Sequence, residues 1–226
     1  MILAINSSTA QYSVALLTLE GVIVAEYIIT PGGNTFTDFM PSIDLILNMS
    51  GSDTSKIGVV AVAIGPGSFT GLRVGLSAAK GIAYSMKIPL IGISGTEALA
   101  SSISYTDKPV CAMITSRRDE AFFALFTREK DDKIVRQSDD KSMNIKEIGA
   151  FLDVPAIIVG NDFEKQKHLL EKSAKDKISF ARQDHWNLRA SSVGVLGLMR
   201  FHSHDFDDVM EVVPDYLRPP DIRQSN

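Results

Sequence analysis

Three observations predict an α/β protein built from two duplicated lobes. The chain has 226 residues, of which 45% are hydrophobic and 22% charged, as in globular proteins with a sizeable buried core. The segment GVVAVAIG, residues 58–65, is almost wholly apolar, which is typical of a parallel strand covered on both faces. The order of predicted strands and helices in residues 1–103 then recurs in residues 104–226.

The first predicted lobe, residues 1–103, opens with a three-strand meander, because three short apolar segments are separated by polar turns. Apolar residues then recur at helical spacing from Phe36 to Leu47, and Gly51 follows as a stop signal. The rest of the lobe reads as alternating strands and helices. The predicted strands are 1–6, 12–19, 22–29, 58–65 and 89–94, and the later helices are 71–86 and 96–104.

The second predicted lobe, residues 104–226, repeats this order. Residues 109–137 again read as strand, polar turn, strand, charged turn and strand. A helix at 145–152, a strand at 156–160 and a helix at 163–172 follow. No low-complexity linker separates the lobes near residues 101–108, so we expect them to pack tightly, with a C-terminal tail that can return to the first lobe.

Charge and cysteine content narrow the classes of function. The chain carries 23 basic and 27 acidic residues, a net charge of −4, which argues against binding RNA alone through its phosphates. The first basic residue is Lys56, after five acidic ones; this fits either a lightly charged domain of buried strands or an acidic face for a basic partner. A single cysteine, Cys111, no secretory signal and no long apolar span predict a cytoplasmic protein without membrane contact.

A glycine-rich loop, GPGSFTG, lies between a predicted strand and a predicted helix. It lacks the Lys-Ser/Thr ending of a P-loop, and its glycines at 65, 67 and 71 do not match G-x-G-x-x-G. Pro66 also removes a backbone donor that a phosphate cradle needs. The loop is therefore predicted to shape the start of the helix rather than to bind phosphate, through Gly65, Pro66, Gly67, Ser68 and Thr70.

The helix after this loop carries a stripe of small residues at a spacing of four: Gly71, Gly75, Ala79 and Ala83. Glycine within a helix costs about 0.5–1 kcal/mol relative to alanine, so close packing along the stripe is expected to compensate. The packing partner is either the chain's own sheet or a second chain, together with the helix of Phe39 to Leu47.

The duplicated meander resembles the plan of the actin, sugar-kinase and Hsp70-like ATPases, a ribonuclease H-like fold. In that fold the turn after the first strand contacts phosphate, and here this turn begins with Asn6, Ser7 and Ser8. These residues are weak candidates for a vestigial phosphate turn, because such hydroxyls commonly satisfy local backbone groups.

A more specific resemblance rests on AIGPGSFTGLRVGLSAAKGIAYSMKIPLIGISGTEALA, residues 63–100. Together with MILAINSSTAQYSVALL, TSRRDEAFFALF and VVPDYLRP, this segment resembles the TsaB (YeaZ) family. The resemblance is strong over residues 1–125, weak to about 205, and returns near the end. It implies an actin-like fold and a non-catalytic partner of the paralogous TsaD subunit, which transfers threonylcarbamoyl to adenosine 37 of tRNAs reading codons that begin with A.

The resemblance further implies a binding surface for TsaD on the first-lobe helices, used for a homodimer when TsaD is absent. The P-loop ATPase TsaE joins the complex, ATP or ADP and metal belong to the partner subunits, and tRNA is contacted only through the complex. The candidate interface residues are Phe39, Ile43, Leu47, Gly71, Arg73, Gly75, Ala79 and Ala83.

The residues independently favour a protein without chemistry of its own. Residues 1–167 contain no histidine, whereas the catalytic paralogue needs two on a first-lobe helix. His202 and His204 form H-x-H near the end of the chain, without a nearby cysteine, and are expected on the surface. A nucleophile elbow, an H-E-x-x-H motif and a Cys–His arrangement are all absent, which leaves a glycoprotease-like peptidase without support. The alternative is an actin-like kinase or ATPase that uses the interlobe cleft.

Two departures from the family pattern bear on that alternative. Asn6 stands where the family's first strand usually ends in Asp, which removes a carboxylate from the actin-like site. GGNTFTDF, residues 32–39, lacks a histidine that the family often has there. Arg117 and Arg118 fit the family pattern; they either reach an acidic or tRNA group in the complex or form an exposed turn.

Overall fold

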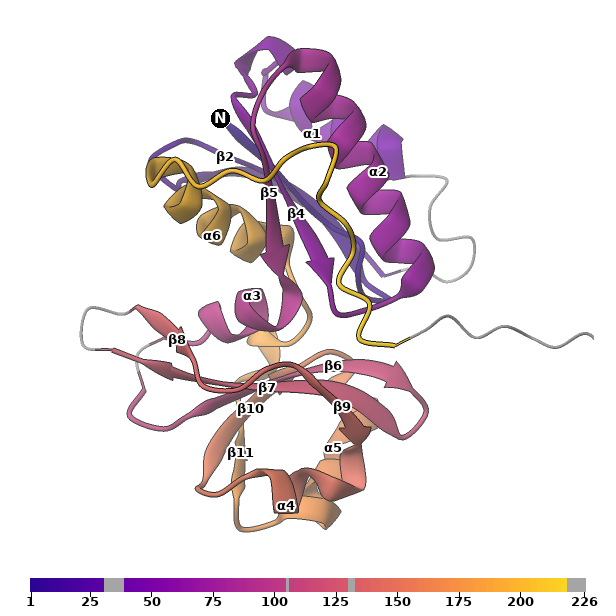
Figure 1. The fold of residues 1–226 in the computed structure, drawn as a ribbon, viewed down its shortest axis with the longest axis vertical. Coiled ribbons are helices and arrows are strands. Elements are labelled where there is room, and N and C mark those ends of the chain that lie inside the picture. The colour runs from indigo at the N-terminus through magenta and orange to yellow at the C-terminus, as the bar shows by residue number, and fades with distance from the viewer. Residues whose placement is uncertain (31–38, 105, 130–132, 219–226) are drawn as a thin grey trace, which may run out of the picture.

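The protein is built around two β-sheets, a five-stranded sheet in the first lobe and a six-stranded sheet in the second (Figure 1). The computed structural model describes residues 1–30, 39–104, 106–129 and 133–218. The first sheet has the order β3 (Ile23–Ile29), β2 (Tyr12–Leu17), β1 (Ile2–Asn6), β4 (Val59–Gly65) and β5 (Leu90–Ser94). The second has the order β11 (Ile178–Phe180), β10 (Ala156–Gly160), β6 (Val110–Arg117), β7 (Glu120–Arg128) and β8 (Ile134–Arg136), and β9 (Lys141–Asn144) also pairs with β7.

The predicted duplication is confirmed by the strand pairing. In each sheet the first strand pairs antiparallel with the next strand in the chain and parallel with a later one: β1 with β2 and β4, and β6 with β7 and β10. One further strand extends the parallel part of each sheet, as β5 beside β4 and β11 beside β10. The short strands β9 and β11 are not predicted from sequence, because segments of three or four residues carry little periodicity.

Helices cover both faces of the first sheet, so the central strands β1 and β4 are buried and mostly apolar on both faces. The helices α1 (Phe39–Met49) and α2 (Phe69–Met86) lie on one face, and α6 (Ala190–His202) lies on the other (Figure 1). Alternate strand residues divide between the two layers: Leu3 and Val60 pack towards α1 and α2, whereas Ile2 and Ala61 pack in the core that contains α6. This explains why β1 and β4 lack polar alternation.

The second sheet carries the helices α4 (Ile148–Phe151) and α5 (Phe163–Ala174). The predicted helix at 145–152 is a 3₁₀ turn, η2 (Ile145–Glu147), followed by α4. Two further 3₁₀ turns are η1 (Thr54–Lys56) and η3 (Gln183–His185).

The last helix of each predicted lobe packs against the other lobe. The helix α3 (Gly95–Ser101) lies between the lobes and contacts β6, while α6 packs on β1, β2 and β4 (Figure 1). The helix α6 and the first part of the tail that follows it thus pack on the sheet of the first lobe, although they lie within the predicted second segment, residues 104–226. Sequence reasoning misses α6 because Gly194 and Gly197 weaken its helical signal. A Cβ at Gly197 would lie 2.6 Å from Ala61 Cβ, so glycine permits the close approach.

The tail after α6 runs along the edge of the first sheet. Asp207 forms an antiparallel bridge with Leu90 of β5, and its carboxylate accepts a hydrogen bond from the Gly92 amide at 2.7 Å. Arg200 pairs with both Asp205 and Asp207 and donates to the Gly92 carbonyl. The tail thereby covers an edge strand that would otherwise expose unpaired backbone groups. In the part of the chain that the structure describes, no helix has the length and apolar character to cross a membrane.

Candidate functional site

The glycine-rich loop joins β4 to α2 and lies against the turn after β1. A Cβ at Gly67 would be 2.2 Å from the backbone oxygen of Ser8, and the Ser68 amide donates to that oxygen at 2.7 Å. Ser68 also caps α2, because its Oγ accepts a hydrogen bond from the Gly71 amide at 3.2 Å. A Cβ at Gly65 would meet the backbone oxygen of Asp215 at 2.5 Å. These glycines are thus required for close approach of backbone, and the following Pro66 is buried.

The turn after β1 uses its polar groups within the fold. Asn6 and Ser7 are fully buried and Ser8 nearly so. Asn6 Oδ1 accepts from both the amide and the hydroxyl of Ser8, at 3.0 and 2.7 Å, and Asn6 Nδ2 donates to the Leu188 carbonyl at 2.9 Å. Ser7 Oγ donates to the Gly71 carbonyl at 2.7 Å. Of the two interpretations of this turn, the contacts favour satisfaction of local groups over a phosphate site.

The small-residue stripe packs against the chain's own first strand, which corrects its assignment to a partner interface. Gly71, Gly75, Ala79 and Ala83 are all buried. A Cβ at Gly71 would lie 1.9 Å from the backbone oxygen of Ser7, and one at Gly75 would lie 2.1 Å from Ser7 Oγ. The physical reason for the stripe is the close approach of α2 to β1 and the turn that follows it.

The candidate interface residues of α1 are buried in the same way. Phe39 is 1% exposed and packs edge-on against Tyr12 of β2, with ring centroids 5.8 Å apart. Ile43 and Leu47 are also buried in the core beneath α1 and α2. They face the sheet because apolar residues at this spacing form the inward side of an amphipathic helix. Phe36 and most of GGNTFTDF, residues 32–38, lie outside the described residues.

The outward sides of α1 and α2 expose a different set of residues. On α1, Met40, Leu45 and Met49 are 53%, 40% and 74% exposed, and on α2, Tyr84 is 71% exposed. Arg73, Ser77, Gly81 and Tyr84 follow one outward line along α2, and a Cβ at Gly81 would have no neighbour within 4 Å. Of the residues named from sequence for the interface, Arg73 alone is exposed. The signal that finds this surface is a second line of small residues on α2, at 77 and 81.

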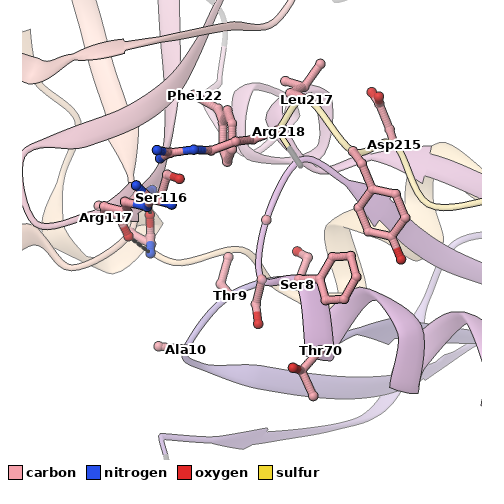
Figure 2. A pocket seen from close by; sticks show the side chains of 16 residues that line it. Ser8, Thr9, Ala10, Thr70, Ser116, Arg117, Phe122, Asp215, Leu217 and Arg218 are labelled. Atoms are coloured by element: carbon pink, nitrogen blue, oxygen red, sulfur yellow. Dashed lines mark hydrogen bonds between the residues drawn. The ribbon is translucent and has the colours of Figure 1, made fainter. Parts of the chain in front are cut away.

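A cleft of about 510 Å³ lies between the lobes (Figure 2). From the first lobe it is lined by Ser8, Thr9 and Ala10 and by the loop residues 67–70, including the exposed Thr70. From the second it is lined by Thr115, Ser116, Arg117, Phe122 and Asn161. The tail residues 215–218 supply the remaining wall, and Figure 2 shows Arg218 extending towards Phe122 and Arg117. Arg118 is exposed at the tip of the β6–β7 hairpin.

A partly buried polar network connects the lobes beside α3. Asp140 of the second lobe accepts a hydrogen bond from Thr96 Oγ1 at 2.6 Å and pairs with Arg136 at 3.3 Å. Arg136 also donates to Ser94 Oγ, the cap of α3, at 2.7 Å. Burial raises the pKa of Asp140, while the hydrogen bond from Thr96 and the charge of Arg136 act in the opposite direction. The network fixes α3 between the two sheets.

The remaining reactive residues lie apart from the cleft. Cys111 is fully buried in β6, and burial raises the pKa of its thiol, as expected for an inert core cysteine. His202 ends α6, where its Nε2 lies 3.0 Å from the Leu19 carbonyl oxygen, and His204 follows in an exposed turn. No group of three or more His, Cys, Asp or Glu among the described residues is arranged to hold a metal ion.

The chain is similar to known proteins in both sequence and structure. A family model described as TsaD, tRNA N6-adenosine threonylcarbamoyltransferase, matches residues 36–223. A Bacillus subtilis protein named tRNA threonylcarbamoyladenosine biosynthesis protein TsaB is 31% identical over 223 residues, which cover 96% of this chain and 93% of that protein.

Solved structures agree with the predicted fold class. YeaZ from Pseudomonas aeruginosa has a TM-score of 0.75 at 18% identity and covers 95% of this chain and 99% of its own. A ROK family protein from Streptococcus pneumoniae has a TM-score of 0.50 at 11% identity, over 88% of this chain and 99% of its own. The two-lobed fold shared with actin-like and sugar-kinase proteins is thereby confirmed.

Proposed function

This chain belongs to the TsaB family, and we propose that it acts in tRNA threonylcarbamoyladenosine formation as a non-catalytic subunit that binds and activates TsaD. In this role it supports the transfer of threonylcarbamoyl to adenosine 37 of tRNAs reading codons that begin with A. The names of its relatives and the family model for residues 36–223 support a place in this modification system.

The observation that carries the proposal is the exposed outward surface of α1 and α2. Met40, Met49 and Tyr84 are each more than half exposed, although large apolar and aromatic side chains are the usual anchors of protein interfaces. Gly81 and Ser77 lie between Arg73 and Tyr84 on α2, and such small side chains allow a partner helix to approach closely. We propose this surface, in place of the buried stripe, as the TsaD-binding face.

The same surface serves a homodimer when TsaD is absent, and TsaE joins the complex through the assembled pair. ATP or ADP and metal belong to the partner subunits, and tRNA contacts this chain only within the complex. The protein has no catalytic residues of its own in this proposal. Asn6, Ser7 and Ser8 form hydrogen bonds within the fold, which supports that assignment. A cytoplasmic location is part of the proposal, because the complex modifies tRNA.

Light scattering coupled to size-exclusion chromatography tests the proposal with this protein and TsaD of the same organism. The wild-type chain is expected to exchange from a homodimer into a heterodimer. Tyr84→Ala and Gly81→Leu should each weaken the heterodimer about tenfold or more, as truncation or obstruction of an interface anchor does. Met199→Ala is the matched control, because Met199 is 59% exposed on α6, on the opposite face of the sheet.

Circular dichroism of each variant checks that the fold is retained. A wild-type chain that ignores TsaD contradicts the proposed function. A heterodimer that tolerates both α2 substitutions retains the function and contradicts the assigned face.

A further inference from the structure

The C-terminal tail crosses from the first lobe to the second at the interlobe cleft. On the first-lobe side, the Asp215 amide donates to the Ile64 carbonyl at 2.7 Å. The Tyr216 ring lies on Phe69 with a centroid distance of 4.9 Å, and its hydroxyl accepts a hydrogen bond from Arg73 Nε at 2.8 Å. The Arg73 guanidinium lies 3.8 Å from the centroid of the Phe69 ring, so one compact cluster holds the tail to the start of α2.

On the second-lobe side, Arg218 holds the β6–β7 hairpin. Its Nη1 lies 2.5 Å from Glu120 Oε2, at the first residue of β7. Both side chains are partly buried, with 28% and 38% exposure. The ion pair between Arg218 and Glu120 therefore contributes more stabilisation than a fully exposed ion pair would.

Between these two attachments, residues 215–218 form one wall of the cleft. Across from them lie the first-lobe turn of Ser8–Ala10 and the hairpin residues Thr115–Arg117 (Figure 2). A Cβ at Gly65 would lie 2.5 Å from the Asp215 backbone oxygen. Glycine at that position thus permits the tail to lie directly on the loop that borders the cleft.

We propose that residues 215–218 are an intramolecular strap that holds the two lobes together and closes the cleft. The Tyr216 cluster anchors the strap to the first lobe, and the Arg218–Glu120 pair fastens it to the second. Loss of the pair frees the hairpin to move away from the Ser8–Ala10 turn, while the first lobe stays intact. The strap does not depend on the proposed function, because all its contacts lie within one chain.

Hydrogen–deuterium exchange of the full chain, followed by mass spectrometry, tests the strap. Arg218→Ala should speed exchange in peptides covering residues 113–123 by about fivefold, the effect of losing one partly exposed ion pair. Arg218→Ala combined with Tyr216→Ala should speed it by about tenfold or more and extend the change to residues 8–10. Peptides of β1 and β10 should keep their wild-type rates.

Val213→Ala is the matched control, since Val213 is a tail residue with 67% exposure. Unchanged exchange at residues 113–123 in the double variant would overturn the strap. So would an equal acceleration in β1 and β10, which would mean that the tail supports overall stability only. Arg218→Ala leaves the contact between Arg73 and Tyr216 in place, so TsaD binding is measured with this single variant, and its result is separate from the test of the strap.

Discussion

Alanine at Gly71 is expected to destabilise the protein, whereas alanine at Gly81 of the same helix is expected to stabilise it. Both substitutions add the same single methyl group, and the two sites differ in the atoms that lie next to that group. Gly71 lies against the turn after β1, where a Cβ would be 1.9 Å from the Ser7 backbone oxygen and 3.1 Å from its carbonyl carbon. At Gly81 a Cβ would have no neighbour within 4 Å.

The magnitudes follow from these contacts. At Gly71 the obstacle is backbone, so α2 or the turn must move; overpacking of this kind costs about 1–3 kcal/mol. The shift also strains the buried hydrogen bond from Ser7 Oγ to the Gly71 carbonyl, whose loss costs about 1–3 kcal/mol. The higher helix propensity of alanine offsets about 1 kcal/mol of this cost, which leaves a net loss of about 1–5 kcal/mol. At Gly81 the propensity gain of about 0.5–1 kcal/mol stands alone.

Equilibrium unfolding in urea, followed by far-UV circular dichroism, measures both changes as free energies of unfolding. An unchanged slope with denaturant would show that the two variants unfold from the same compact state. If Gly71→Ala proves as stable as the wild type, α2 does not approach the first strand as closely as described, and the buried assignment of the stripe is refuted.

Two further predictions concern charged groups that join distant segments. Burial raises the pKa of Asp140 above its ordinary value of 3.8, so the folded chain holds this proton more tightly than the unfolded chain. Stability should therefore fall as pH rises from that value through the raised pKa, and Asp140→Asn should lack this fall in urea unfolding; parallel pH profiles would contradict the assignment. Glu26 is 5% exposed and accepts hydrogen bonds from Arg189 and from the Ser191 amide at the start of α6. Glu26→Ala should cost about 1–3 kcal/mol in thermal or urea unfolding, more than Arg189→Ala, whose side chain is 45% exposed; equal losses would argue against the role at α6.

The order of elements follows from local patterns. Short apolar segments with polar turns predict β1, β2 and β3, and the unbroken apolar segment 58–65 predicts the central position of β4. These signals are local because side-chain alternation and turn residues act over a few positions. Elements with weak local signals, such as α6 with its two glycines, appear only in the folded chain.

The candidate site shows the same division. The sequence identifies α2 and its small residues as a place of close packing, and the glycine loop as poor for phosphate. Which side of α2 faces inward is decided by tertiary packing, because small residues occur both on the line of Gly71 and Gly75 and on the line of Ser77 and Gly81. Helical periodicity gives the spacing of a stripe and carries no information about what lies opposite it.

Contacts between distant segments lie beyond any local pattern. Asp215 beside Gly65, Arg218 beside Glu120 and Asp140 beside Thr96 each join residues from separate parts of the fold. Local propensity and periodicity thus determine the strands, the duplication and the apolar layers of this protein. Three features are decided only when the sheets pack: which face of α2 is exposed, the packing of α3 and α6 against the other lobe, and the position of the tail beside the cleft. The reason is that side-chain volumes and the distances between backbone segments act only in the assembled core.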